Sequence, residues 1–177
     1  MSHSALETFV GRVRASWGPI SSTLVRGCEI AMADLARAAP SESWLARLHE
    51  ARPLTAELHR DADHDFLLLA HAEHAGLYRP PHDHGRAWVV YAVQQGEIEM
   101  RTFARVDDGN GNRRLVQRDS VVLRAGQAQI YLPGDIHDTR CLTGPALLFR
   151  FTERDLKNEP HLARYAEQDD AWSRAGG

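Results

Sequence analysis

The spacing of hydrophobic residues predicts helices in the N-terminal part of the chain. From residue 4 to about residue 51, apolar side chains recur every three or four positions, as in Leu24, Cys28, Ala31 and Leu35. Prolines at positions 19, 40 and 53 divide this segment, so we expect three short helices. Because each helix has one apolar face, we expect the helices to cover the outside of a larger core.

From residue 54 onward the hydrophobic pattern is that of β-strands. Short apolar or alternating runs are separated by Gly, Pro, Asp and Asn, which predicts many short strands joined by turns. No helical pattern connects neighbouring strands, so a β-sandwich or barrel is favoured over a parallel α/β sheet. The predicted strands are Leu54–Arg60, Asp65–His71, Ala87–Val93, Glu97–Phe103, Arg114–Val116, Ser120–Arg124, Ala128–Leu132 and Ala146–Thr152.

After Thr152 the chain becomes polar, and we expect a short helical tail. Pro160 interrupts this tail, and His161–Trp172 can form a last short helix. The loop Asp107–Asn112 lacks the bidentate glutamate of a calcium loop, so we predict a hairpin turn there. The expected organisation is a helical extension at residues 1–52, a β-barrel at 53–153 and a C-terminal tail at 154–177.

Composition and charge narrow the class of protein. The 177 residues and 43% hydrophobic content fit one domain with an appendage. A net charge of −3 gives no indication of nucleic acid or a membrane as partner. Cys28 and Cys141 lack metal-ligand spacing, and no signal or membrane-spanning segment is apparent. We expect a cytoplasmic protein that acts on a small molecule, and the sequence leaves its oligomeric state open, a homodimer included.

Two segments rich in histidine and turn residues carry the most specific signal. His82 and His84 are two residues apart next to a β segment, so both imidazoles are expected to project from one side of the chain. His137 follows a Pro-Gly-Asp-Ile turn about fifty residues later. Neutral imidazole is the commonest metal ligand, and three of them leave coordination positions open for chemistry. The alternative is chance proximity, since the chain contains ten histidines.

These segments resemble the two sequence motifs of the cupins, which are double-stranded β-helix (jelly-roll) barrels. The resemblance extends from about residue 53 to residue 152. It implies an all-β core with an N-terminal helical extension and a short C-terminal helical tail. The matching residues are Gly76, His82, His84 and Gly96 in the first motif and Pro133, Gly134 and His137 in the second.

Within the cupins, the chain resembles bacterial cysteine dioxygenase-like proteins. The glutamate that usually completes the first motif is absent, because Trp88 and Val89 stand in its place. This absence is typical of the cysteine dioxygenase group, whose iron is held by three histidines. The resemblance implies Fe(II) bound by His82, His84 and His137, while Zn, Ni, Cu and Mn are not excluded. It implies a mononuclear dioxygenase that converts a carboxylate-bearing thiol and O2 to a sulfinate.

Three residues are candidates for holding this substrate. Arg60 precedes the second predicted strand, as the carboxylate-binding arginine of the group does, or it is an ordinary surface charge. Arg150 stands with Leu148 and Thr152 where the group has a Ser-x-His-x-Tyr pattern, and an inward Arg150 needs an anionic partner. Tyr91 has the strand parity that aims its hydroxyl into the barrel, unless the backbone satisfies it.

The missing Ser-x-His-x-Tyr pattern keeps two other functions open. A three-histidine cupin can cleave a carbon–carbon bond of a small diketone-like molecule, or it can bind a metal or ligand without turnover. The sequence predicts no catalytic residue beyond the metal ligands. We expect His71 and His74 at the surface or behind the metal ligands, and strand alternation turns Asp83 away from the metal.

Overall fold

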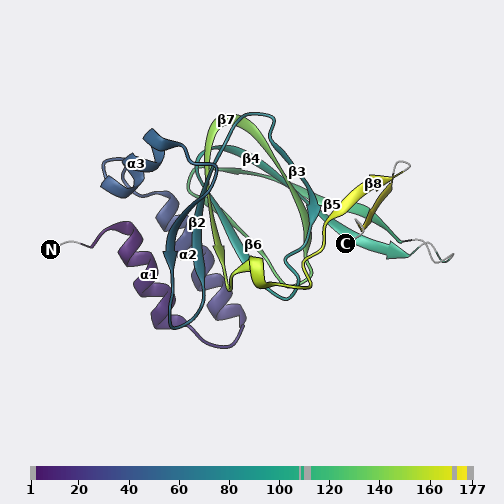
Figure 1. The fold of residues 1–177 in the computed structure, drawn as a ribbon, viewed down its shortest axis with the longest axis horizontal. Coiled ribbons are helices and arrows are strands. Elements are labelled where there is room, and N and C mark those ends of the chain that lie inside the picture. The colour runs from purple at the N-terminus through teal and green to yellow at the C-terminus, as the bar shows by residue number, and fades with distance from the viewer. Residues whose placement is uncertain (1–2, 108, 110–112, 169–170, 175–177) are drawn as a thin grey trace.

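The computed structural model describes residues 3–107, 109, 113–168 and 171–174, and it consists of helices packed on a β-barrel (Figure 1). The helices lie on one side of the barrel, and a small C-terminal hairpin lies on the opposite side. No helix among the described residues is long and apolar enough to cross a membrane. The helices are α1 (Ala5–Ser16), α2 (Ser22–Ala36) and α3 (Ser43–Ala51).

Serine side chains begin the first two helices. Ser4 accepts a hydrogen bond from the backbone amide of Glu7, and Ser21 accepts one from the amide of Leu24. Both bonds satisfy amides that the first turn of a helix leaves unpaired. The helix starts therefore follow from local sequence, without help from the barrel.

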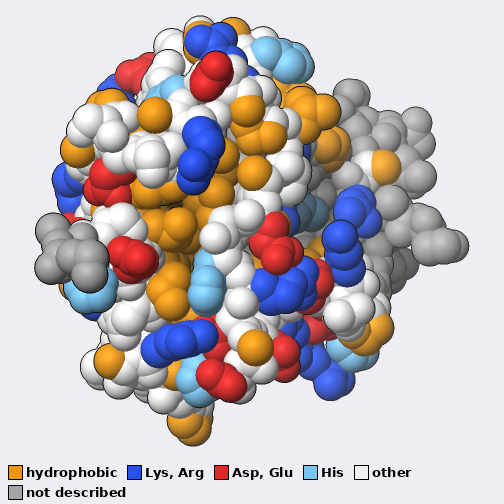
Figure 2. Space-filling model, turned by 60° about the vertical axis from the view of Figure 1, so that its left-hand side comes forward, with side chains coloured by type: hydrophobic (Ala, Val, Ile, Leu, Met, Phe, Trp, Pro, Cys, Tyr) orange, Lys and Arg blue, Asp and Glu red, His pale blue; other side chains and the backbone are white. Residues whose placement is uncertain are grey.

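An apolar core lies between the helices and the barrel. Cys28, Met32 and Leu35 of α2 are each at most 1% exposed, and they share a buried cluster with Phe149 and Phe151 of the barrel. Figure 2, turned to bring the helical side forward, shows hydrophobic side chains in a central hollow among charged ones. Burial raises the pKa of the Cys28 thiol to about 12, so this thiol is structural and unreactive.

The β-strands form a barrel in which every pairing among the described strands is antiparallel. The strand order is β1-β2-β7-β4-β5, with β3 also paired to β7 and β6 also paired to β4. This arrangement confirms the predicted all-β, cupin-type jelly roll. The strands are β1 (Ala56–Arg60), β2 (Leu67–Glu73), β3 (Tyr78–His82), β4 (Val89–Asp107), β5 (Arg113–Arg124), β6 (Gln127–Tyr131), β7 (Ile136–Thr152), β8 (Tyr165–Gln168) and β9 (Ala171–Arg174), with a 3₁₀ turn η1 (Leu156–Asn158).

Two long strands, β4 and β7, run through both halves of the barrel. Residues 89–93 of β4 pair with the second half of β7, and residues 97–103 pair with its first half. The register shifts between these stretches, where Gly96 adopts a φ of +85°. A Cβ at Gly96 would lie 2.8 Å from the carbonyl oxygen of Thr143, so glycine is required at this bend. The first-motif glycine thus lets one strand serve both halves.

Alternate residues at the end of β7 face opposite sides of the barrel wall. Phe149 and Phe151 pack in the cluster that faces the helices, whereas Leu148 packs in the interior cluster with Tyr91. Arg150 is two residues from Leu148 and therefore shares its face. The sequence left the direction of Arg150 open, and the structure places it inward.

The C-terminal part of the fold differs from its prediction. Apart from the short turn η1, the described tail forms the β8–β9 hairpin and no α-helix. Ala163 and Tyr165 are buried while Arg164 between them is exposed, which is the two-residue period of a strand. The predicted helical tail is therefore wrong, because contacts of alternate residues with the barrel decide the conformation of this segment.

The strand prediction also differs in detail. β4 and β5 each correspond to two predicted strands, because bends within them look like breaks in the sequence. β3 is not predicted, since it contains Pro80 and Pro81, which cannot donate to a ladder. The hairpin turn predicted at Asp107–Asn112 lies partly outside the described residues, while the strands that flank it pair with each other.

Candidate metal centre

Three histidine side chains from two separate segments meet inside the barrel. His82 ends β3, His84 follows in the next loop, and His137 is at the start of β7. Each residue offers a ring nitrogen, and these nitrogens all lie within 4.8 Å of one another. His84 and His137 are at most 1% exposed, and His82 is partly exposed. The structure thus brings together the three residues that the sequence proposes as metal ligands.

Backbone contacts fix the two histidine segments relative to each other. His82 and His137 are direct partners in the antiparallel pairing of β3 with β7. The amide of Gly134 donates a hydrogen bond of 3.1 Å to the carbonyl of Gly85, which joins the turns next to His137 and His84. Gly85 and Gly134 have φ values of +62° and +82°, a region that favours glycine. Gly85 and Gly134 therefore shape the turns that bring the imidazoles together.

The three imidazoles fit a divalent metal ion. Burial lowers the pKa of His82, and it lowers the pKa of His84 and His137 well below the usual value, so the rings are neutral. Nδ1 of His82 lies 2.9 Å from the carbonyl of Pro80, so it carries the proton and leaves a lone pair on Nε2. That Nε2 is 3.2 Å from Nε2 of His137. Two nitrogens bound side by side to one ion at about 2.1 Å have a separation of roughly 3 Å.

Asp83, between the two histidines, faces away from them and holds the C-terminal segment. Its carboxylate accepts hydrogen bonds from the amide of Gly85 at 3.0 Å, the amide of Ala163 at 2.9 Å and the hydroxyl of Tyr165 at 3.2 Å. The amide of Asp83 also donates to the carbonyl of Ala163. The segment after β7 is therefore attached to the loop that carries His82 and His84.

Tyr91 and Arg150 are cross-strand neighbours on β4 and β7, beside the histidines. The hydroxyl oxygen of Tyr91 lies 3.3 Å from Nε2 of His84. Nε of Arg150 is buried without a hydrogen-bond partner, and no carboxylate among the described residues lies within 4 Å of this guanidinium. Arg150 is thus an interior cation without an anionic partner.

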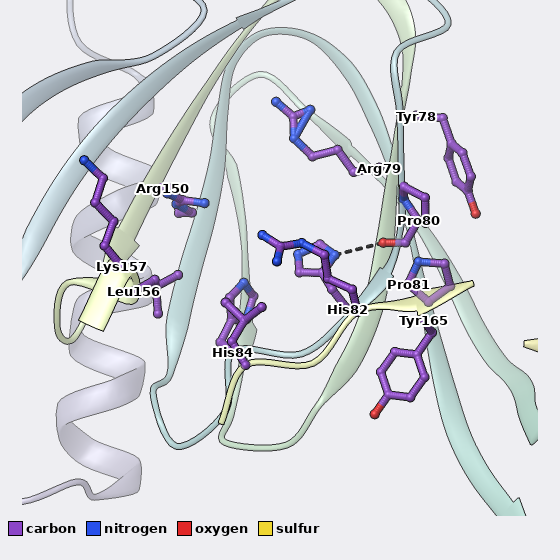
Figure 3. Close-up of a pocket in the computed structure, with 12 residues that line it drawn as sticks. Tyr78, Arg79, Pro80, Pro81, His82, His84, Arg150, Leu156, Lys157 and Tyr165 are labelled. Atoms are coloured by element: carbon purple, nitrogen blue, oxygen red, sulfur yellow. Dashed lines mark hydrogen bonds between the residues drawn. The ribbon is translucent and has the colours of Figure 1, made fainter. Parts of the chain in front are cut away.

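A cavity of about 560 Å³ reaches the histidines (Figure 3). His82, His84 and Arg150 line it, and Figure 3 shows Leu156 and Lys157 of the C-terminal segment beside the same space. A small molecule in this cavity can contact both the histidines and the guanidinium. This geometry differs from a closed structural metal site, whose ligands leave no room for a substrate.

Arg60 lies outside the histidine cavity. It forms ion pairs with Glu57 at 2.8 Å and with Asp155 at 3.1 Å, and 47% of its side chain is exposed. It lines a second cavity of about 440 Å³, which shares Arg150 with the first. Arg60 does not reach the histidines because it ends β1, and β2 lies between β1 and β7. The structure therefore places Arg150, and not Arg60, in the lining of the histidine cavity.

His71 is more deeply placed than the sequence indicates. It is 7% exposed and lines the second cavity, whereas His74 is exposed as expected. Its Nδ1 lies 3.2 Å from the carbonyl of Leu54, and its Nε2 is buried without a partner. Burial lowers the pKa of His71 to about 4, so the ring is neutral. Leu69 lines the same cavity and lies two residues before His71, so the alternation of side chains along a strand could have predicted that both face the same side.

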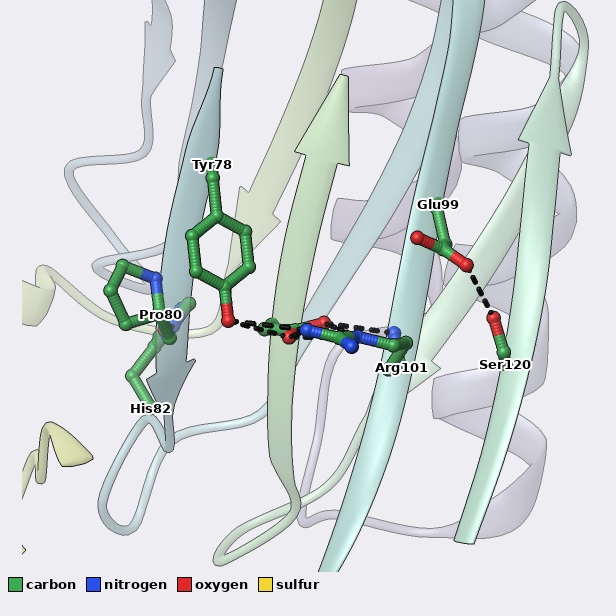
Figure 4. Close-up of polar contacts among 7 residues, drawn as sticks. Tyr78, Pro80, His82, Glu99, Arg101 and Ser120 are labelled. Atoms are coloured by element: carbon green, nitrogen blue, oxygen red, sulfur yellow. Dashed lines mark hydrogen bonds and ion pairs between the residues drawn. The ribbon is translucent and has the colours of Figure 1, made fainter. Parts of the chain in front are cut away.

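Behind His137, a polar network on the other face of the barrel wall fixes the strands (Figure 4). Asp138 is 1% exposed and accepts hydrogen bonds from Nε of Arg101 at 3.1 and 3.0 Å and from the hydroxyl of Tyr78 at 3.0 Å. Burial and the charge of Asp138 raise the pKa of Tyr78 to about 12, so its hydroxyl keeps the proton that it donates. Because these residues belong to β7, β4 and β3, the network holds His82 opposite His137.

The fold and the histidine cluster together define a cupin-type barrel with a site suited to a divalent metal. The sequence matches no family model and no curated protein.

Several solved structures are similar to the chain. KdgF from Halomonas sp. has 18% identity over 55% of this chain and 74% of its own, with a TM-score of 0.42. The cupin domain of Schizosaccharomyces pombe Cnp3 has 15% identity over 55% and 57%, with a TM-score of 0.43. An oxalate oxidase has 21% identity over 62% and 54%, also with a TM-score of 0.43. These likenesses are too low to carry an argument, and the fold rests on the strand pairing of this chain.

Proposed function

We propose that the protein is a mononuclear non-haem iron dioxygenase that converts a small, carboxylate-bearing thiol to a sulfinate. The observation that carries this proposal is a cluster of three convergent, neutral imidazoles, two of which line a cavity together with Arg150, whose guanidinium has no carboxylate partner among the described residues. His82, His84 and His137 would hold a ferrous ion through three nitrogens, and so few protein ligands would leave the ion accessible to small molecules. The guanidinium matches the carboxylate of such a substrate.

The chemistry needs no further reactant. A thiolate R–S⁻ and O2 give R–SO2⁻: two S–O bonds form, the O–O bond breaks, and four electrons pass from sulfur to oxygen. The bound metal supplies activation of dioxygen. The residues of the chain orient the substrate, since Arg150 holds the carboxylate while the hydroxyl of Tyr91, 3.3 Å from His84, offers a hydrogen-bond donor beside the reacting atoms.

Oxygen consumption tests the proposal directly. The protein is purified without added metal, its metal content is measured, and O2 uptake is followed with Fe(II) and cysteine, 3-mercaptopropionate or cysteamine. We expect oxygen uptake with cysteine and 3-mercaptopropionate, which carry a carboxylate. We expect much less uptake with cysteamine, because it has no carboxylate for Arg150 to bind. We expect His82→Ala to lose both bound metal and uptake. Absence of uptake with every thiol would contradict the proposed reaction, and uptake with a diketone alone would favour carbon–carbon cleavage.

A further inference from the structure

The lining of the histidine cavity is strongly cationic, although the whole chain carries a net charge of −3. Four cationic side chains line it, and no Asp or Glu is among the described residues that do so. A site with this excess of positive charge attracts and binds anions, and a bound divalent metal adds to the excess. The four residues are Arg79, Arg150, Lys157 and Arg164.

Three of these four cations form no close ion pair in the part of the chain that the structure describes. Arg79 lies 3.0 Å from the carboxylate of Glu73, which neutralises it. Arg150, Lys157 and Arg164 form no ion pair within 4 Å among the described residues. A ligand with one carboxylate compensates one of these three cations and leaves the other two in the cavity lining without a close counter-charge.

The three cations without a close ion pair differ in exposure, since Arg150 is half-buried whereas Lys157 and Arg164 are exposed. Arg150 projects from β7 into the barrel, lines the same cavity as His82 and His84, and is the cross-strand neighbour of Tyr91, whose hydroxyl lies 3.3 Å from His84. Lys157 and Arg164 belong to the exposed C-terminal segment. Arg164 is held beside the histidines because its backbone bridges to His82. One anionic group can thus bind the half-buried Arg150 and another the exposed cations of the C-terminal segment.

The histidine cavity is large enough to hold a ligand longer than a three-carbon acid. The cavity of about 560 Å³ is in the range that holds molecules of many atoms. The second cavity, about 440 Å³, shares Arg79, Arg150, Leu156 and Lys157 with it. A substrate that reaches from the histidines to Lys157 has room without any movement of the chain.

We propose that the substrate of the histidine cavity carries two anionic groups, the inner one bound by Arg150 and the outer one by Lys157 and Arg164. This inference deepens the proposed function and takes from it only the histidine cavity as the substrate site. The outer group is a carboxylate or a phosphate-like group, since ammonium and guanidinium groups bind both.

Calorimetric titration of the purified protein tests this without turnover. The probes are succinate, 3-phosphonopropionate and butyrate, at one ionic strength. We expect at least one dianion to bind about tenfold or more tightly than butyrate, and the tighter dianion identifies the outer group. We expect Lys157→Gln/Arg164→Gln to abolish this preference while leaving butyrate binding unchanged. Arg118→Gln, which removes an exposed charge outside the cavity, is the matched control and should leave the preference intact.

Equal binding of all three probes, or a preference that persists in the double variant, would overturn the inference. Oxygen uptake with mercaptosuccinate and 3-mercaptopropionate separates the two proposals. If the protein prefers dianions but consumes no oxygen with either thiol, the inferred substrate class stands and the proposed dioxygenase activity is rejected. If it consumes oxygen with both thiols at the same KM, the dioxygenase activity stands and the second anionic group is rejected.

Discussion

At the scale of single residues, the proposed recognition of a substrate carboxylate depends on Arg150. Replacing it by glutamine removes a charge-assisted contact that is worth about 1.5–3 kcal/mol. We expect Arg150→Gln to lower kcat/KM for carboxylate-bearing thiols by roughly 10–100-fold, mainly through KM. Steady-state oxygen uptake measures this effect.

The control for Arg150 uses a substrate instead of a second mutation. Cysteamine has no carboxylate, so its weak turnover should be equal in the wild type and in Arg150→Gln. A similar loss for cysteamine and for 3-mercaptopropionate would mean that the substitution disturbs the metal centre, and it would contradict the assigned role.

Asp61 is a buried carboxylate whose charge ties α1 to the barrel. Burial raises its pKa, but hydrogen bonds from Arg14, His59 and two backbone amides outweigh this and lower the pKa to about 2. A lowered folded-state pKa gives stability that is present above the unfolded value near 4 and is lost as the pH falls towards 2. We expect Asp61→Asn to cost roughly 2 kcal/mol at neutral pH and little at pH 2.

Urea unfolding of Asp61→Asn between pH 2 and pH 7 checks this pH dependence. Asp63→Asn, which changes an exposed carboxylate in the same turn, should leave the unfolding free energy nearly unchanged. A cost for Asp61→Asn that does not vary with pH would show that the carboxylate acts through its shape and not through its charge.

The sequence identifies the three histidines of the candidate metal centre, but it does not show which other side chains lie near them. Local spacing and turn glycines identify His82, His84 and His137, because a metal motif is encoded in short segments. Arg60 and Arg150 are equally plausible from sequence, since their surroundings depend on which strands lie between them and the histidines. The depth of His71 likewise depends on strand parity across the whole barrel.

At the scale of elements, the pair formed by Arg101 and Asp138 holds β3, β4 and β7 in register. Arg101→Ala leaves a buried carboxylate without its cation, which costs about 3 kcal/mol. We expect a corresponding fall in the urea midpoint together with weaker metal binding, because His137 is adjacent to Asp138. Arg124→Ala breaks an exposed pair with Glu97 and should cost less than about 1 kcal/mol. If Arg101→Ala and Arg124→Ala lower the free energy of unfolding equally, the buried pair of Arg101 and Asp138 stabilises the fold no more than an exposed pair does.

The elements themselves were only partly predictable. Helix caps and amphipathic spacing are local signals, so the three helices follow from the sequence. β3 is hidden by Pro80 and Pro81, and its place is fixed by pairing with β7, which is distant in sequence. The sequence predicts a helix where the structure has the C-terminal hairpin. Ala163 and Tyr165 are fixed by hydrogen bonds to Asp83, and such long-range contacts leave no local pattern in the sequence.

At the scale of the whole molecule, a bound metal should stabilise the folded barrel. A ligand at 100 times its Kd adds about 2.7 kcal/mol, which corresponds to roughly 5–10 °C in Tm for a chain of this size. We expect chelation to lower Tm by this amount and Fe(II) or Zn²⁺ to restore it. Differential scanning calorimetry provides the measurement.

Two controls separate site binding from general effects of ions on Tm. Ca²⁺, which prefers oxygen ligands, should not restore Tm, and His137→Ala should show no response to chelator or to metal. Restoration of Tm in His137→Ala would place the stabilising ion elsewhere.

The attachment of the C-terminal segment to Asp83 has a consequence for how fast an ion would leave the histidines. Three hydrogen bonds join Asp83 to Ala163 and Tyr165, and Arg164 and Tyr165 line the mouth of the histidine cavity. An ion held by the histidines would have to pass this segment, so its loss to a chelator should be faster once Asp83→Ala removes the carboxylate that holds the segment in place.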